Sequence, residues 1–71
     1  MPKRYTAKQI IKVLKIKGFF LVSQRGSHKK FRNKEGVVTI VPEHKKEVTP
    51  GTFSQILKQT GILRSEFEDL V

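Results

Sequence analysis

One histidine stands where it could do chemistry. His28 follows a turn signal, Gly26-Ser27, and begins a short stretch, 28–32, in which Phe31 is the apolar residue among basic ones and which is predicted to form a strand. In a strand Phe31 is the residue that a core would bury, and Lys29 then shares its face. The opposite, solvent-facing side carries His28, Lys30 and Arg32. The pattern therefore predicts an imidazole at a turn–strand junction, on an open face lined with basic side chains.

That arrangement suits the cleavage of RNA. RNA contains its own nucleophile, the 2′-hydroxyl, so an enzyme need only move protons and stabilise the charge of the phosphorane. A neutral imidazole acting as general base contributes roughly 10²–10⁴ in rate, or roughly 3–5 kcal/mol of the barrier. Nearby Lys and Arg side chains would stabilise the phosphorane, and the backbone N–H groups and hydroxyl of Gly26-Ser27 could hold a phosphate oxygen. From spacing alone, however, a solvated or core-edge histidine is the more common role, so both interpretations stay open.

Other chemistries find less support in the sequence. A metal-dependent nuclease needs clustered carboxylates, whereas Glu35, Glu43 and Glu47 are scattered singly through turns and loops. His28 and His44 are too far apart for a local zinc pair, and the chain has no cysteine. A P-loop, a dinucleotide fingerprint and a nucleophile elbow are all absent from the sequence. We therefore expect neither a metal nor a cofactor.

The charge points to a polyanionic partner. Fifteen Lys or Arg face six Asp or Glu, for a net charge of +9 and a pI near 10.3. All fifteen bases lie in residues 1–65, while three of the acids gather at the C-terminus as Glu66, Glu68 and Asp69. Such a domain attracts nucleic acid through counterion release and long-range steering, although a merely soluble basic surface has the same composition. The C-terminal acids are interpreted as a solvated face, with a contact to a partner as the alternative.

These residues must be positioned by a small number of elements. Thr6 and Gln9 have the spacing of a capping box, apolar residues follow at helical spacing to Leu14, and Gly18 ends this first helix. Strands are predicted over 19–24, 28–32 and 37–41, joined by short turns into an antiparallel meander. In the third strand we expect Val38 and Ile40 to point inward and Thr39 outward.

A polar loop, 43–48, leads to the second predicted helix. Thr49 and Pro50 suit its cap and first position, and Gly61 ends it. Ser65 and Glu68 repeat the capping-box spacing, which predicts a short acidic helical turn over 65–71. The whole chain, 1–71, is thus one α+β domain of order αβββα, with a three-stranded antiparallel sheet that carries its helices on one face. Its longest uncharged apolar-rich stretch, 18–24, is too short to span a bilayer, so we expect a soluble, cytoplasmic protein without membrane contact.

Four motifs follow one another along the chain. They are Gly18-Phe19, then Gln24-Arg25-Gly26-Ser27-His28, then Val41-Pro42-Glu43-His44, and finally the run from Gly51 to Ile62 (GTFSQILKQTGI). Together these motifs resemble the HicA toxin family. The likeness covers roughly residues 6–67 in the family's order and spacing. The Gly-Ser-His element before an alternating strand, with Pro-x-His after the third strand, is its most specific part.

The resemblance implies a fold like that of double-stranded-RNA-binding domains and a metal-independent endoribonuclease that cuts mRNA. It also implies a HicB-type antitoxin that binds the toxin and covers its active face. The family's catalytic histidine falls on His28, and His44 falls in the Pro-x-His segment, where it would order a loop or contact substrate. The residues expected to bind RNA are Arg25, Gly26, Ser27, Lys29, Lys30, Arg32, Lys45 and Lys46.

Two rival functions are compatible with the same charge. A non-catalytic double-stranded-RNA-binding module would share the element order, but such modules hold phosphates with bases at the start of the second helix. Here that helix contains only Lys58, well past its start, with Lys45 and Lys46 in the loop before it. A small DNA-binding or ribosome-associated protein would explain the charge but not His28 on the open face. All three would bind nucleic acid in a salt-sensitive manner, so cleavage is the discriminating observation.

Overall fold

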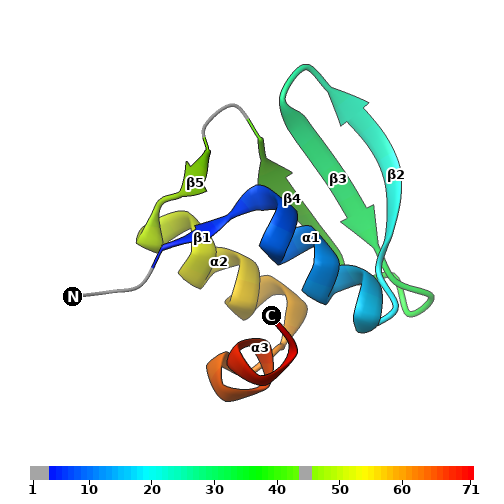
Figure 1. Cartoon of the computed structure of the whole chain (residues 1–71). Coiled ribbons are helices and arrows are strands. Elements are labelled where there is room, and N and C mark those ends of the chain that lie inside the picture. Colours follow the sequence, from blue (N-terminus) through cyan, green and yellow to red (C-terminus); the bar gives the residue numbers. More distant parts are fainter. Residues whose placement is uncertain (1–3, 44–45) are drawn as a thin grey trace.

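The computed structural model describes residues 4–43 and 46–71. Eight elements follow one another along the chain (Figure 1). They are β1 (Tyr5–Thr6), α1 (Ala7–Ile16), β2 (Phe20–Arg25), β3 (His28–Arg32), β4 (Val38–Pro42), β5 (Glu47–Val48), α2 (Pro50–Thr60) and α3 (Arg64–Leu70). His44 and Lys45, both predicted to have functional roles, lie outside the described residues.

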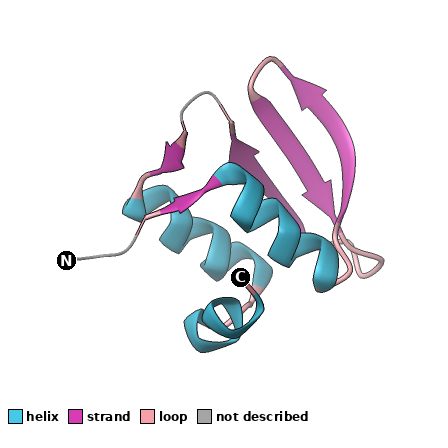
Figure 2. Cartoon of the chain, in the orientation of Figure 1, coloured by secondary structure: helices cyan, strands magenta, loops and turns pink. Residues whose placement is uncertain are grey.

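The three longer strands form the predicted antiparallel meander, in the order β2-β3-β4. Burial alternates along β3 and β4, because the helices pack against one face of the sheet and leave the other to solvent (Figure 2). The α+β fold with helices on one face is thereby confirmed. β1 and β5 add a separate two-residue antiparallel pair that joins the start of α1 to the start of α2. The sequence did not predict this pair, since two residues are too few to show a strand period.

The ends of α1 are set by local sequence, as predicted. The Thr6 side chain accepts the Gln9 N–H at 3.1 Å, and the Gln9 side chain accepts the Thr6 N–H at 2.9 Å, which completes a capping box. After the helix, the Phe19 N–H donates to the Leu14 carbonyl (2.9 Å) and the Gly18 N–H to the Lys15 carbonyl (3.1 Å). This is the Schellman pattern, and it turns Phe19 into the core directly before β2.

The two later helices differ in how well their starts were predicted. α2 begins as expected, with the Thr49 hydroxyl accepting the Thr52 N–H at 3.4 Å and Pro50 in the first position. For α3 the predicted capping box at Ser65 and Glu68 is wrong. The helix begins at Arg64, because the Glu66 carboxylate accepts the N–H of Leu63 at 3.1 Å and thereby caps it earlier.

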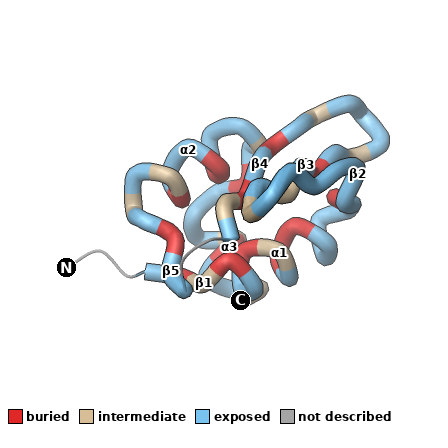
Figure 3. The backbone as a smooth tube through the Cα atoms, turned by 90° about the horizontal axis from the view of Figure 1, so that it is seen from above, coloured by how far each residue is buried: buried red, intermediate tan, exposed pale blue. Residues whose placement is uncertain are grey.

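An aromatic cluster holds β1, α2 and α3 together. The rings of Tyr5, Phe53 and Phe67 are all buried, and their centroids lie 4.7–5.0 Å apart in tilted or edge-to-face pairs. Such pairs contribute about 0.5–1.5 kcal/mol each beyond their buried area. The rest of the core comes from α1, β3, β4 and the buried side of α2, together with Phe19, Val48 and Ile62. Figure 3 shows that β2, in contrast, is exposed along its length.

The inward face of β4 differs from the prediction. Thr39 and Val41 are buried, at 1% and 0% exposure, whereas Val38 and Ile40 are exposed at 37% and 47%. The register decides this phase, because Thr39 lies directly opposite Phe31 and opposed residues share a face. The buried Thr39 hydroxyl is satisfied, since it donates to Gln59 Oε1 on α2 at 2.9 Å. The expectation that Val38 and Ile40 point inward is therefore wrong.

Candidate active site

A tight turn positions His28. Gly26 and Ser27 alone connect β2 to β3, and Arg25 lies directly opposite His28. Gly26 has a φ of +60° while Ser27 has no positive φ, which is the pattern of a type II′ hairpin turn. The Gln24 amide donates to the Gly26 carbonyl at 3.1 Å, and the Glu43 N–H donates to the Ser27 carbonyl at 2.6 Å. The turn is thus held from both sides, and the backbone of His28 is held with it.

The sheet register collects the predicted bases around His28. Opposed residues share a face, so three cross-strand rows make up the open side of the sheet. The rows are Arg25–His28–Pro42, Ser23–Lys30–Ile40 and Phe20–Arg32–Val38. His28, Lys30 and Arg32 are all exposed, which confirms the predicted face of β3.

A hollow of about 480 Å³ lies in the first two of these rows. Its lining residues are Ser23, Gln24, Arg25, His28, Lys30 and Ile40. His28 and Lys30 are two residues apart on one strand, which separates their Cα atoms by about 7 Å. The hollow therefore places one imidazole next to two cations, with Ser23 and the apolar Ile40 on either side of Lys30 in the second row. Sequence reasoning missed Ser23 and Ile40, because only the cross-strand register brings them to His28.

The chemistry available in this hollow is proton transfer next to positive charge. His28 supplies the imidazole, the side chain most often used for general acid–base catalysis. Arg25 and Lys30 are placed to stabilise an anionic phosphorane, and none of the described residues that line the hollow has a carboxylate to offset them. Farther along the open face, the Arg32 guanidinium lies 5.7 Å from the centre of the Phe20 ring, a cation–π contact that holds it against the sheet.

Lys29 is not brought to His28. It lies on the helix side of the sheet, half-buried, and its ammonium pairs with the Glu43 carboxylate at 3.0 Å. It lines a second hollow of about 570 Å³ beside α1, together with Lys8, Ile11, Lys12, Lys15, Ile16 and Glu43. This basic surface was not predicted as a site, although the spacing of Lys8, Lys12 and Lys15 is that of one helix side. Lys46 is exposed directly before β5.

Within residues 4–43 and 46–71, no group of three or more His, Asp or Glu side chains is placed to hold a metal ion. The described helices are also all too short or too polar to cross a membrane.

The fold and the site together indicate a class of protein. A three-stranded antiparallel sheet, helices on one face and a basic open face are compatible with the double-stranded-RNA-binding-domain fold. Residues 7–62 match the family model described as HicA toxin of bacterial toxin–antitoxin, which is well over half of the chain and includes the whole sheet and His28. The chain therefore belongs to the HicA toxin family. The comparison with curated proteins gives no match.

Proposed function

We propose that this protein is the ribonuclease toxin of a toxin–antitoxin system and that it cleaves mRNA by metal-independent acid–base catalysis from His28. Membership of the HicA family supports the toxin and the ribonuclease activity. The observation that carries the mechanism is the placing of an exposed His28 in a hollow between Arg25 and Lys30. Because the proposed substrate is mRNA, we expect the protein to act in the cytoplasm.

The reaction begins with the 2′-hydroxyl of the nucleotide bound in the hollow. His28 accepts the hydroxyl proton while the 2′-oxygen forms a bond to phosphorus. The bond from phosphorus to the 5′-oxygen then breaks, and the His28 imidazolium returns the proton to that leaving oxygen. The products are a 2′,3′-cyclic phosphate and a 5′-hydroxyl. Proton transfer supplies roughly 3–5 kcal/mol of barrier lowering, and the flanking cations supply more through the phosphorane.

The open face gives the RNA backbone a path across the sheet. Arg25, Lys30 and Arg32 lie on the same side as His28, and we assign them direct phosphate contacts. The Gly26 and Ser27 backbone N–H groups at the turn are assigned to a phosphate oxygen next to the scissile bond. Lys29, Lys45 and Lys46 are assigned long-range attraction of RNA. For Lys29 this follows from its place on the other side of the sheet.

A HicB-type antitoxin is the proposed inhibitor. The chain carries a net charge of +9, and its candidate active site lies on an exposed, cationic face. A partner with an acidic surface would neutralise this face and exclude RNA from it, and the resulting affinity would fall with salt. An affinity between toxin and antitoxin that does not change with salt would argue against charge neutralisation.

The function is tested by comparing the wild type with His28→Ala. Each is expressed inducibly while growth and RNA integrity are followed, and each purified protein is assayed on RNA in EDTA. We expect the wild type to arrest growth and to cut RNA to cyclic-phosphate ends, and the folded variant to do neither. Lys34→Ala is the matched control, since Lys34 is a base in the turn at the other end of β3. Products with a free 3′-hydroxyl would overturn the mechanism.

The second candidate function is a non-catalytic double-stranded-RNA-binding module, which the fold favours. The first turn of α2 argues against a binding module of this kind, because it consists of Pro50-Gly51-Thr52. The basic residue of that helix, Lys58, lies in its last turn. If wild type and His28→Ala bind RNA equally, and neither cuts RNA nor harms the cell, the binding module is the better description.

A further inference from the structure

The two edges of the three-stranded sheet are unlike each other. On β2 the pairing with β3 shifts between Leu21 and Ser23, and the strand ends in Arg25. On β4 the pairing is regular from Val38 to Pro42, and none of its five residues is charged. Proteins protect exposed edges from further pairing with bulges and charged residues. β2 carries both of these devices, so β4 is the edge suited to receive another strand.

The backbone groups on the outer edge of β4 follow from its register. The Glu43 N–H bonds to the Ser27 carbonyl and the Asn33 N–H to the Val37 carbonyl, at 2.6 and 3.0 Å. In an antiparallel ladder the bonded pairs alternate, so Thr39 and Val41 between these two points bond to β3. Val38 and Ile40 therefore turn their N–H and C=O groups to the outer edge. Pro42, which has no N–H, closes this row of donors.

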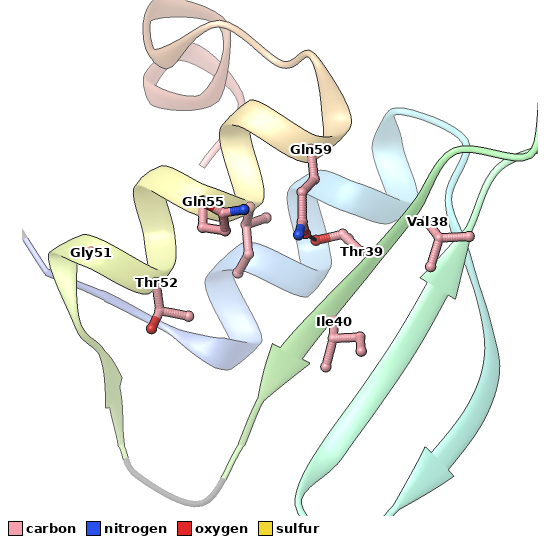
Figure 4. Close-up of a pocket in the computed structure, with 8 residues that line it drawn as sticks. Val38, Thr39, Ile40, Gly51, Thr52, Gln55 and Gln59 are labelled. Atoms are coloured by element: carbon pink, nitrogen blue, oxygen red, sulfur yellow. Dashed lines mark hydrogen bonds between the residues drawn. The ribbon is translucent and has the colours of Figure 1, made fainter.

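A groove runs along that edge. It has a volume of about 340 Å³ and lies between residues 38–40 of β4 and the side of α2 that carries Thr52, Gln55 and Gln59 (Figure 4). The side chains of Val38 and Ile40 face away from the helices while that of Thr39 faces α2. Because these side chains point to opposite faces of the sheet, all three can line one groove only where it follows the outer edge of the strand. In Figure 4 the bond between Thr39 and Gln59 ties the two walls together.

We propose that this groove binds an extended segment of the antitoxin, which adds to β4 as a fourth strand of the sheet. The partner's identity rests on the proposed function, whereas its extended shape rests on the edge itself. Donors and acceptors repeated every second residue match another strand, and a helix alongside confines that strand. The described side chains that line the groove are all neutral, so no cation among them would attract a phosphate backbone. A second copy of this chain would bring a further +9 of like charge.

The surroundings specify the sequence of the bound strand. Adjacent strands lie about 4.8 Å apart, so an added strand would run about 10 Å from β3. Its side chains on the open face would lie next to Val38 and Ile40, with Lys30 and Arg32 one strand farther away, so a long acidic side chain such as Glu would be favoured there by the positive charge. Ile40 lines both this groove and the hollow that contains His28. A strand bound at the edge would therefore form a wall beside the candidate active site.

Amide hydrogen exchange tests this inference directly. Exchange is measured by NMR on His28→Ala, alone and in complex with the HicB-type antitoxin. We expect the amides of Val38 and Ile40 to exchange at least about ten-fold more slowly in the complex, because each gains a hydrogen bond. The amides of Thr39 and Val41 serve as internal controls, since they already bond to β3 in the free protein.

Substitutions provide the second test. Ile40→Pro removes an outward N–H without breaking the ladder to β3, and should weaken antitoxin binding by about ten-fold, whereas Ile40→Thr keeps the N–H and is its control. Gln55→Arg should also weaken binding by filling the groove. Ser54→Arg, which adds the same charge at an exposed position of α2 outside the groove, should not. Slow exchange at Thr39 and Val41 confirms that each variant is folded.

The outcomes separate this inference from the proposed function. If the antitoxin stops cleavage while Val38 and Ile40 exchange as before, the edge is not its binding site and the ribonuclease stands. If RNA or a second copy of this chain protects these amides instead, the assignment to the antitoxin is overturned. If wild type cuts no RNA, the proposed function falls, whereas protection of the two amides by the antitoxin would still support the added strand.

Discussion

The turn before His28 yields the sharpest prediction. Gly26→Ala places a Cβ on a residue with φ +60°, and apart from Gly26 and its two chain neighbours no atom of the described residues lies within 4 Å of that Cβ. The substitution therefore adds backbone strain without a clash, at a cost of about 1–3 kcal/mol. In a domain of this size each kcal/mol lowers the Tm by about 4–8 °C. If the turn relaxes to relieve the strain, Arg25 and His28 move relative to each other, and cleavage should fall by more than the folded fraction explains.

Gly36→Ala is the matched control. Gly36 lies in the other β-turn at a φ of +85°, and a Cβ there also meets nothing within 4 Å. The stability cost should be similar, while cleavage per folded molecule should stay at the wild-type level. Thermal unfolding and RNA cleavage are measured on both variants, with cleavage well below either Tm. Equal cleavage by the two folded variants would refute the claim that the Gly26 turn positions His28.

Three further predictions concern charge and the core. Lys30→Ala should slow cleavage and reduce the slope of log affinity against log salt by about 1, while Lys34→Ala should leave the cleavage rate unchanged. The hydrogen bond from Lys17 holds the pKa of Glu66 below its ordinary value, and the bond from the Leu63 N–H adds to this. This lowered pKa stabilises the fold at pH values above the unfolded pKa of 4.5, and the added stability is lost as the pH falls through the pKa of the folded state. Glu66→Gln should therefore flatten the acid side of a stability–pH profile, and Glu68→Gln should not. Thr39→Val should cost about 0.5–1.5 kcal/mol in urea unfolding through loss of the bond to Gln59, and an unchanged midpoint would show that this bond contributes nothing.

Local sequence determined the first two helices, the three longer strands and one face of the site. The capping box at Thr6 and the glycine after α1 act within a few residues, so the ends of that helix could be predicted. The alternation around Phe31 fixed which residues of β3 share a face, and it placed His28 with Lys30 and Arg32. Recognition of the family rested likewise on short motifs, and the match over residues 7–62 confirmed it.

Tertiary structure decided what depends on partners distant in the chain. The apolar residues of β4 fall on both of its faces, so the sequence does not show which face is buried. The register with β3 and the hydrogen bond to the Gln59 amide on α2 put Thr39 inside. The ion pair of Lys29 with Glu43 likewise follows from a contact that no sequence period encodes. The groove beside β4 exists because α2 packs along one strand edge. That arrangement is a property of the assembled fold rather than of either segment.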